Sequence, residues 1–330
     1  MKHWMLEIIP GKLQFTRIRE NEIWSGIIIH TCGIRFGISK GIPSFIPSSI
    51  YRKYRRIKAY YENIPVLAWS SKNEYIRHMR RIHFLGIKRL IELLIEKKLK
   101  NVKVLCIGCG WGFEVFLLSE LLRRRKVSFK IVGLDLARKP LVYGKKLAKK
   151  ISVWDNVDFA IGVVEYLPFK SNTFDAITAI FGSLDHTINI AQALKEIWRV
   201  LKPGGFFLAT FLNKFSLHTV LSAIKSPRFL LKFLKKAHEK IAYVTVRGFR
   251  IPTHFWNIIE ISNYFSKFSM HAIEKFGIFC IIPASFKKQK MSKFHKILAF
   301  FDFYSSQILW FLGRYLMYIF KKLKDEQTLF

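Results

Sequence analysis

Apolar positions along the chain follow two different periods. Between residues 75 and 98 they recur at helical spacing, with Arg and Lys at the positions between them. From residue 101 onward, short apolar runs rich in β-branched residues alternate with helical patterns. This alternation predicts helices over 112–126, 139–151 and 187–201, and strands over 102–107, 129–135, 157–161, 174–181 and 205–212.

Strands that alternate with helices are typical of a parallel sheet covered by helices on both faces, so we expect an α/β, Rossmann-like fold. Three regions are predicted: a small β-rich segment over 1–47, helices over 48–100, and the sheet domain over 101–330. The sheet domain is expected to carry a helical insertion at about 213–265, with a strand at 241–246 and a helix at 256–268. Near the end, "HAIEKFGIFCIIP" predicts an amphipathic helix, and "RYLMYIFKKL" predicts a closing strand.

The segment most similar to a membrane span is residues 297–320, "ILAFFDFYSSQILWFLGRYLMYIF". It contains Asp302 and Arg314 and is interrupted at Gly313, so we do not expect it to cross a bilayer. Lys12, Arg17 and Arg19 interrupt the apolar residues of the N-terminal stretch, which argues against a signal peptide.

The composition adds a large positive charge. The formal net charge is +34, and the excess of basic over acidic residues is 13 in 1–101, 7 in 102–212 and 14 in 213–330. Such a charge favours an anionic partner, either RNA or an anionic membrane surface, although it is also typical of proteomes rich in Lys and Ile. Four scattered cysteines exclude a disulfide framework and indicate a cytoplasmic protein.

A glycine-rich turn follows the first predicted strand of the sheet. "VLCIGCGWGF" places Gly108, Gly110 and Gly112 where a strand gives way to a helix, a context in which glycine lets the backbone approach a ligand closely. Asp135 ends the next strand, 23 residues after Gly112. A carboxylate at that position accepts hydrogen bonds from ribose hydroxyls. The turn reads G-x-G-x-G rather than G-x-G-x-x-G, which argues against a nicotinamide enzyme.

Several motifs resemble the class I S-adenosylmethionine-dependent methyltransferases, in particular the broad group of quinone-biosynthesis and small-molecule methyltransferases. They are "VLCIGCGWG", "GLD", "GVVEYLPFKSNTFDAI", "GSLDH" and "EIWRVLKPGGFFLAT", in that order. The resemblance covers about residues 75–212. It implies S-adenosylmethionine as cofactor and a seven-stranded sheet. The cofactor-binding residues that it implies are Cys106, Gly108, Cys109, Gly110, Gly112, Asp135, Leu136, Val163, Val164, Glu165, Phe181 and Gly182.

Two positions depart from the family's pattern. Cys106 replaces an acid two residues before the first glycine, and Val163 replaces the Asp or Asn that reads the adenine amino group. A thiol is mostly neutral at pH 7. Weakened or rearranged cofactor binding is therefore one expectation, and a non-catalytic scaffold stays an alternative to an enzyme.

Asp185 and His186, in "GSLDHT", are the predicted catalytic residues, since the family brings this segment toward the substrate. A histidine can remove a proton from the methyl acceptor at neutral pH. The alternative is that Asp185 caps the following helix and His186 only packs. His254 is a second candidate base.

Residues 6–47 resemble the small four-cysteine zinc ribbon that precedes some methyltransferase domains. Only Cys32 remains of its ligands, because Ile9, Lys12 and Ile29 occupy the other positions. One thiolate cannot make a tetrahedral zinc site, even with His30 nearby. We therefore expect no metal, and a remnant that is held by the packing of Ile8, Ile27, Ile29, Phe36 and Phe45.

Two substrate classes follow. The first is an apolar or lipid-like small molecule, methylated at or near a membrane surface. Its support is the family resemblance and the aromatic, basic segment around 293–314, a composition typical of helices that lie in a headgroup layer. The second is RNA, which the basic clusters around 52–58 and 77–81 favour.

Overall fold

The computed structural model describes residues 1–330 except 20–21, 64–71, 226–240, 247, 284–288 and 324–330. Its centre is a seven-stranded sheet in the order β12-β13-β9-β8-β5-β6-β7. The strands are β5 (Asn101–Ile107), β6 (Ser128–Asp135), β7 (Val157–Ile161), β8 (Phe174–Ala179), β9 (Leu201–Leu212), β12 (Met270–Ile278) and β13 (Tyr315–Lys322). The strands from β5 to β9 pair in parallel, whereas β13 is antiparallel to both neighbours. The predicted α/β sheet and its five strands are confirmed.

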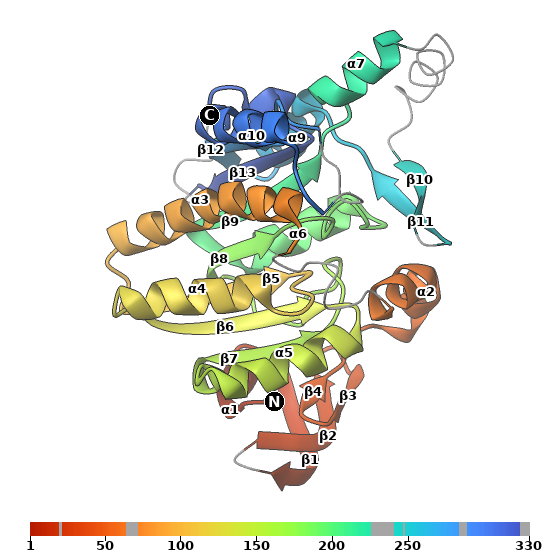
Figure 1. The fold of residues 1–330 in the computed structure, drawn as a ribbon. Coiled ribbons are helices and arrows are strands. Elements are labelled where there is room, and N and C mark those ends of the chain that lie inside the picture. The colour runs from red at the N-terminus through yellow and green to blue at the C-terminus, as the bar shows by residue number, and fades with distance from the viewer. Residues whose placement is uncertain (20–21, 64–71, 226–240, 247, 284–288, 324–330) are drawn as a thin grey trace.

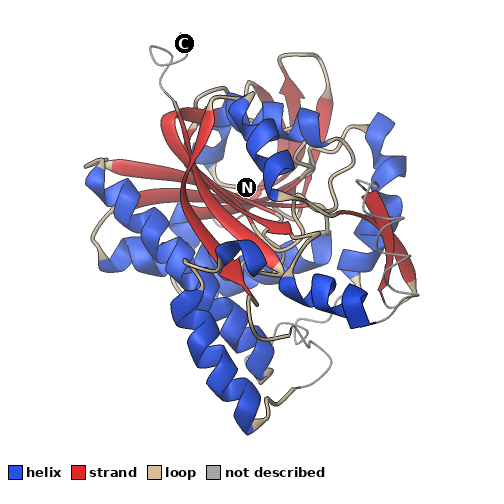
Figure 2. Ribbon diagram, turned by 90° about the horizontal axis from the view of Figure 1, so that it is seen from above, coloured by secondary structure: helices blue, strands red, loops and turns tan. Residues whose placement is uncertain are grey.

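Helices cover both faces of this sheet (Figures 1 and 2). One face carries α3 (Glu74–Glu96), α4 (Phe113–Arg124) and α5 (Arg138–Lys150), and the other carries α6 (Ile190–Val200) and α9 (Ile258–Ser266). Strand β5 shows how the sheet serves two cores. Val104 and Cys106 pack toward α3 and α4, while Leu105 and Ile107 pack toward α6. Burial on both faces explains why the strands appear in the sequence as continuous apolar runs.

The N-terminal segment is a small antiparallel sheet at the β7 edge of the main sheet (Figure 1). It consists of α1 (His3–Glu7), β1 (Gly11–Arg19), β2 (Glu22–His30), β3 (Arg35–Ser39) and β4 (Ile42–Pro43). The Phe45 amide donates a hydrogen bond to the Ile161 carbonyl at 2.7 Å. This contact satisfies part of the edge of β7, which would otherwise be open to pairing with another chain.

The predicted packing of this segment is partly wrong. Ile8, Phe36 and Phe45 are buried as expected, but Ile27 is 38% exposed and Ile28 is the buried residue of that run. Successive side chains of a strand point to opposite faces, so a core that holds Ile28 turns Ile27 and Ile29 away from it. Cys32 lies in the turn after β2, and its sulfur is 2.8 Å from Nδ1 of His30. Within the described residues, no three His, Cys, Asp or Glu side chains form a group that could hold a metal ion.

The amphipathic helix predicted from "HAIEKFGIFCIIP" is wrong, because residues 270–278 form strand β12. The strand pairs with β13, some 40 residues later in the chain, from Met270 opposite Lys322 to Ile278 opposite Tyr315. A Cβ atom at Gly277 would lie 2.6 Å from the Trp310 carbonyl oxygen, so the backbone of β12 at Gly277 lies close to the backbone at Trp310, just before β13. Long-range pairing of this kind overrides local helical periodicity. The predicted closing strand is confirmed as β13.

Three further elements surround the carboxyl edge of the sheet. Helix α2 (Ser48–Glu62) and the hairpin of β10 (Ile241–Val246) and β11 (Phe249–His254) lie side by side there (Figure 1). The insertion begins with α7 (Leu217–Lys225), which confirms its predicted helical start. The predicted strand at 241–246 is confirmed as β10, and 226–240 lie outside the described residues.

Helix α10 (Lys293–Ser305) packs on α3. Among the described helices, none is long and apolar enough to cross a bilayer.

Candidate active site

The glycine turn connects β5 to α4 at the carboxyl edge of the sheet and is hydrogen-bonded to the end of β6. Gly108, Gly110 and Gly112 all have φ between 50° and 86°, in the left-handed region that favours glycine. The Gly110 amide donates to Oδ2 of Asp135 at 2.8 Å, and the Ala137 amide donates to Oδ1 at 2.8 Å. Asp135 is therefore fixed at the end of β6, beside the turn that follows β5, where open α/β sheets bind ligands.

Two cavities meet at this turn. The inner cavity, of about 90 Å³, is bounded by α2, the turn and the loop after β8. The apolar cavity, of about 870 Å³, extends from the turn along α4 and α5. The walls of both include Tyr61, Gly108, Asp135 and Phe181. A ligand at the turn can therefore contact both cavities.

The structure brings together most of the residues that the sequence analysis nominated for the cofactor. Nine of them line one or both cavities: Gly108, Cys109, Gly110, Asp135, Leu136, Val163, Val164, Phe181 and Gly182. The other three, Cys106, Gly112 and Glu165, line neither cavity. Oε1 of Glu165 instead accepts hydrogen bonds from the Tyr54 hydroxyl and, at 3.1 Å each, from the amides of Ile188 and Asn189. Glu165 thus anchors α2 against the chain that enters α6.

The chain is similar to several known proteins. A family described as "Methyltransferase domain" matches residues 105–209. An uncharacterised protein of Methanocaldococcus jannaschii is 27% identical over 69% of this chain and 81% of its own. The ubiquinone/menaquinone biosynthesis C-methyltransferase of Bartonella quintana is 38% identical over 42% of this chain and 54% of its own. The chain thus spans little more than half of that enzyme. A crystal structure of a Pyrococcus horikoshii protein aligns with 81% of this chain and 99% of its own, at 22% identity and a TM-score of 0.48.

Residues 105–209 therefore form a methyltransferase domain of the class I S-adenosylmethionine-dependent type. S-adenosylmethionine is accordingly its cofactor, and the residues around the turn fit that molecule. The carboxylate of Asp135 has lone pairs left after its two backbone hydrogen bonds, which suits ribose hydroxyls. Burial raises the pKa of Asp135 to about 6, so the methyltransferase holds it mostly ionised at pH 7.

An acid from helix α4 lies close to Cys106 in the folded chain. Cys106 is fully buried, and burial raises the pKa of its thiol well above the usual range, with the charge of Glu114 adding to the shift. Glu114 stands in the first turn of α4, lines the apolar cavity and is 8% exposed. Its Oε2 accepts a hydrogen bond from Oγ1 of Thr178, on β8, at 3.3 Å. An acid therefore lies beside position 106 although the sequence has none there.

The groups around Glu114 do little to stabilise its ionised form. Nε2 of His83, on α3, is 3.9 Å from Oε1, but burial, followed by the charge of Arg80, lowers the pKa of His83 to about 3. The imidazole is therefore neutral at pH 7. Burial raises the pKa of Glu114 to about 8, with only the Thr178 hydrogen bond opposing the shift. The sequence analysis missed Glu114. The available signal was its place in the first turn of the helix that follows the glycine turn.

His186, one of the two predicted catalytic residues, lines the inner cavity. Its Nδ1 donates to the Pro252 carbonyl at 3.1 Å, so in the neutral ring Nε2 carries the lone pair. A Cβ atom on Gly182 would lie 3.2 Å from Nε2 and 3.3 Å from the Tyr61 hydroxyl. Burial lowers the pKa of His186, so its ring is neutral and able to accept a proton at pH 7.

Asp185 and His254 have different surroundings. Oδ1 of Asp185 accepts hydrogen bonds from the Leu212 amide at 3.1 Å and from Nε1 of Trp256 at 3.0 Å, and the residue lines neither cavity. It does not cap α6, since Asn189 does so. Nε2 of His254 is 3.0 Å from Oε1 of Glu260, outside both cavities. Asp185 thus ties the end of β9 to Trp256, and His254 holds the start of α9 through Glu260.

Proposed function

We propose that the methyltransferase transfers a methyl group from S-adenosylmethionine to an apolar or lipid-like small molecule. The observation that carries this proposal is the apolar cavity, because its volume of about 870 Å³ lies in the range of small-molecule sites and it opens at the glycine turn. Its wall is mainly apolar, with Met79, Phe113, Phe116, Leu117, Leu147, Ile151, Val153, Ile180 and Phe181. The Bartonella quintana relative is named as a quinone-biosynthesis enzyme, which supports the same class of acceptor.

The residues at the turn would hold the cofactor as follows. Asp135 accepts hydrogen bonds from the ribose hydroxyls, and Val163 and Val164 pack beside the adenine. The glycine turn lets the methionine part approach the backbone. Glu114 takes the place of the acid missing at position 106 and binds the cofactor's ammonium group. An ammonium ion that is removed from water needs a carboxylate as its partner. Glu114 lines the apolar cavity and lies close to Cys106, so it can supply that carboxylate.

The bound cofactor supplies an activated methyl group, and the chain supplies position and a base. In-line methyl transfer depends mainly on holding donor and acceptor close and aligned. Gly108, Phe181 and Tyr61 lie where the two cavities meet, so they shape that position. Nε2 of His186 accepts a proton if the acceptor must lose one, and the Pro252 carbonyl keeps the ring in the required tautomer. Asp185 then acts as a positioning residue, since it holds the backbone next to His186.

The exposed face of α10 supports action at a membrane surface. Phe294, Ile297, Phe300, Phe301 and Tyr304 are between 56% and 66% exposed, and Lys293 and Lys296 flank them. The opposite side of the helix is fixed, because Oδ2 of Asp302 lies 2.6 Å from Nε2 of His78 on α3. Exposed aromatic residues with flanking lysines are typical of helices that lie in the headgroup layer of an anionic bilayer. We therefore assign α10 to peripheral contact with such a surface.

Two experiments test this function. Isothermal titration with S-adenosylhomocysteine should give saturable binding, and the absence of binding at millimolar ligand would overturn the proposal. Methyl transfer from radiolabelled cofactor should then be detected on a short-chain quinol presented in vesicles with anionic lipid. Replacing His186 by Asn should slow transfer at saturating cofactor. Transfer to RNA with none to the quinol would favour the second candidate, which the exposed basic residues of α2 support.

A further inference from the structure

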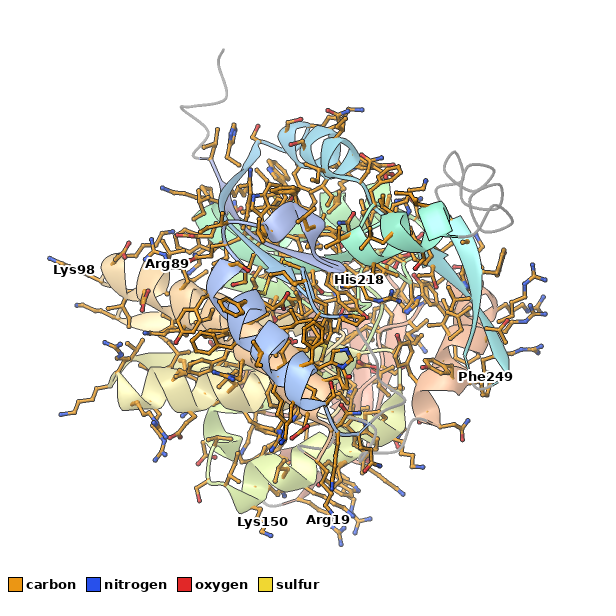
Figure 3. All side chains as sticks on the ribbon, turned by 45° about the horizontal axis from the view of Figure 1, so that its top comes forward. Arg19, Arg89, Lys98, Lys150, His218 and Phe249 are labelled. Atoms are coloured by element: carbon orange, nitrogen blue, oxygen red, sulfur yellow. The ribbon has the colours of Figure 1, made fainter. Side chains whose placement is uncertain are left out.

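A third cavity lies between α2 and the β10–β11 hairpin, beside the active site. In Figure 3 the labelled Phe249 marks the hairpin next to α2, and its ring centroid is 5.9 Å from that of Tyr60. This basic cavity has a volume of about 520 Å³. Its wall consists of five cationic side chains and three others: Arg52, Lys53, Arg55, Arg56, Arg250, Ile57, Tyr243 and Pro252. The described wall contains no carboxylate.

The positive charge of the basic cavity is not balanced by nearby acids. The one acid of α2, Glu62, accepts hydrogen bonds from the amides of Arg138 and Lys139 at 2.7 and 2.9 Å, at the start of α5. None of the ion pairs found among the described residues involves one of the five cations. Arg250 stacks over the ring of Tyr243 at 4.5 Å, which holds one guanidinium in place. Five like charges on one wall repel each other and favour a multivalent anion.

The basic cavity shares its inner wall with the active site. Ile57 lines both the basic cavity and the inner cavity. Pro252, on the far side, accepts the hydrogen bond that sets the tautomer of His186. Ile50, Tyr54, Ile57, Val163 and Ile251 form a small apolar cluster that fixes α2 and β11 to the cofactor side of the sheet. An anion in the basic cavity is thus one layer of side chains away from His186.

We propose that the basic cavity binds a phosphate or diphosphate group of the methyl acceptor. This inference rests on the proposed function and narrows it to acceptors that combine an apolar part with such a group. Guanidinium groups bind phosphate oxygens through paired hydrogen bonds, and four of the five cations are arginines. A small phosphate ester fits better than RNA, because RNA binding requires cations spread along a groove, whereas these five converge on one cavity.

The test compares two double variants of the whole chain. Arg56→Ala with Arg250→Ala removes one cation from each wall of the basic cavity. Lys146→Ala with Lys150→Ala removes the same charge from the exposed surface of α5, and Figure 3 shows Lys150 far from Phe249. Inorganic pyrophosphate binding is measured by titration calorimetry. We expect the first pair to weaken binding about a hundredfold, at roughly tenfold per guanidinium, and the second to change it less than about threefold. Equal effects of the two pairs would overturn the proposal.

Three further measurements separate the sources of phosphate and the two proposals. Retention on phosphatidylcholine vesicles that contain phosphatidic acid, lost in the Arg56/Arg250 variant, would support the inference with a lipid phosphate as the source. Binding of a 20-nucleotide RNA without binding of pyrophosphate would overturn it. S-adenosylhomocysteine should bind both double variants as it binds the wild type. If that ligand fails to bind the wild type, the proposed function fails, whatever the pyrophosphate result.

Discussion

The assignment of Glu114 predicts a steep dependence of cofactor affinity on pH. The carboxyl has a pKa of about 8 in the free protein, and only its ionised form pairs with the ammonium group. About 1% is ionised at pH 6 and about half at pH 8, so this group alone raises the affinity about 50-fold over that interval. Asp135, with a pKa of about 6, contributes about another twofold. Affinity for S-adenosylhomocysteine should therefore rise about 100-fold from pH 6 to pH 8.

Glu114→Gln provides the decisive comparison. The variant should keep only the twofold change that Asp135 supplies, and at pH 8 it should bind S-adenosylhomocysteine roughly 10- to 100-fold more weakly, the usual effect of losing a charged hydrogen bond. Titration calorimetry at pH 6, 7 and 8, in two buffers of different ionisation enthalpy, also reports whether the wild type releases a proton on binding.

Two controls separate binding from structural damage. 5′-Methylthioadenosine lacks the amino-acid part of the cofactor, so its affinity should be the same in wild type and Glu114→Gln. Adding Cys106→Asp to Glu114→Gln should restore part of the lost affinity, because the new carboxylate lies beside the vacated one. An unchanged pH dependence in Glu114→Gln, or an equal loss of methylthioadenosine binding, would refute the reasoning.

Other residues give predictions of their own. Asp135→Ala should abolish calorimetric binding of both S-adenosylhomocysteine and methylthioadenosine, because both carry the ribose; retained affinity would contradict the ribose assignment. Burial raises the pKa of Asp185 to about 7, so the folded state holds a proton that the unfolded state loses above about pH 4. The contribution of Asp185 to the free energy of unfolding therefore decreases as pH rises from about 4 to about 7, and urea unfolding of Asp185→Asn should show a smaller decrease over that range than the wild type. Phe300→Ser with Tyr304→Ser should reduce sedimentation with anionic vesicles severalfold without changing cofactor affinity, and unaltered sedimentation would exclude α10 as the contact.

Local patterns were sufficient for the five parallel strands of the sheet and for the glycine turn. The strands of the sheet between 102 and 212 are buried on both faces, so each appears in the sequence as a continuous apolar run. The glycines that follow β5 adopt positive φ, a conformation that glycine favours, and they therefore mark the turn. The same local reasoning failed at β12, where the partner strand lies far along the chain, and at Ile28, where the choice of buried face depends on what covers the segment.

The sequence by itself thus determined the fold class, the methyltransferase domain and which side chains stand at the ends of β5, β6 and β8. Only the tertiary structure placed Glu114 beside Cys106 and showed that His186 lines a cavity whereas Asp185 does not. It also brought the arginines of α2 and β11, some 200 residues apart in the chain, to one cavity. The physical reason is distance along the chain. Periodicity and turn chemistry act over a few residues, whereas the ionisation of a carboxyl and the shape of a cavity depend on helices and loops that meet only after folding.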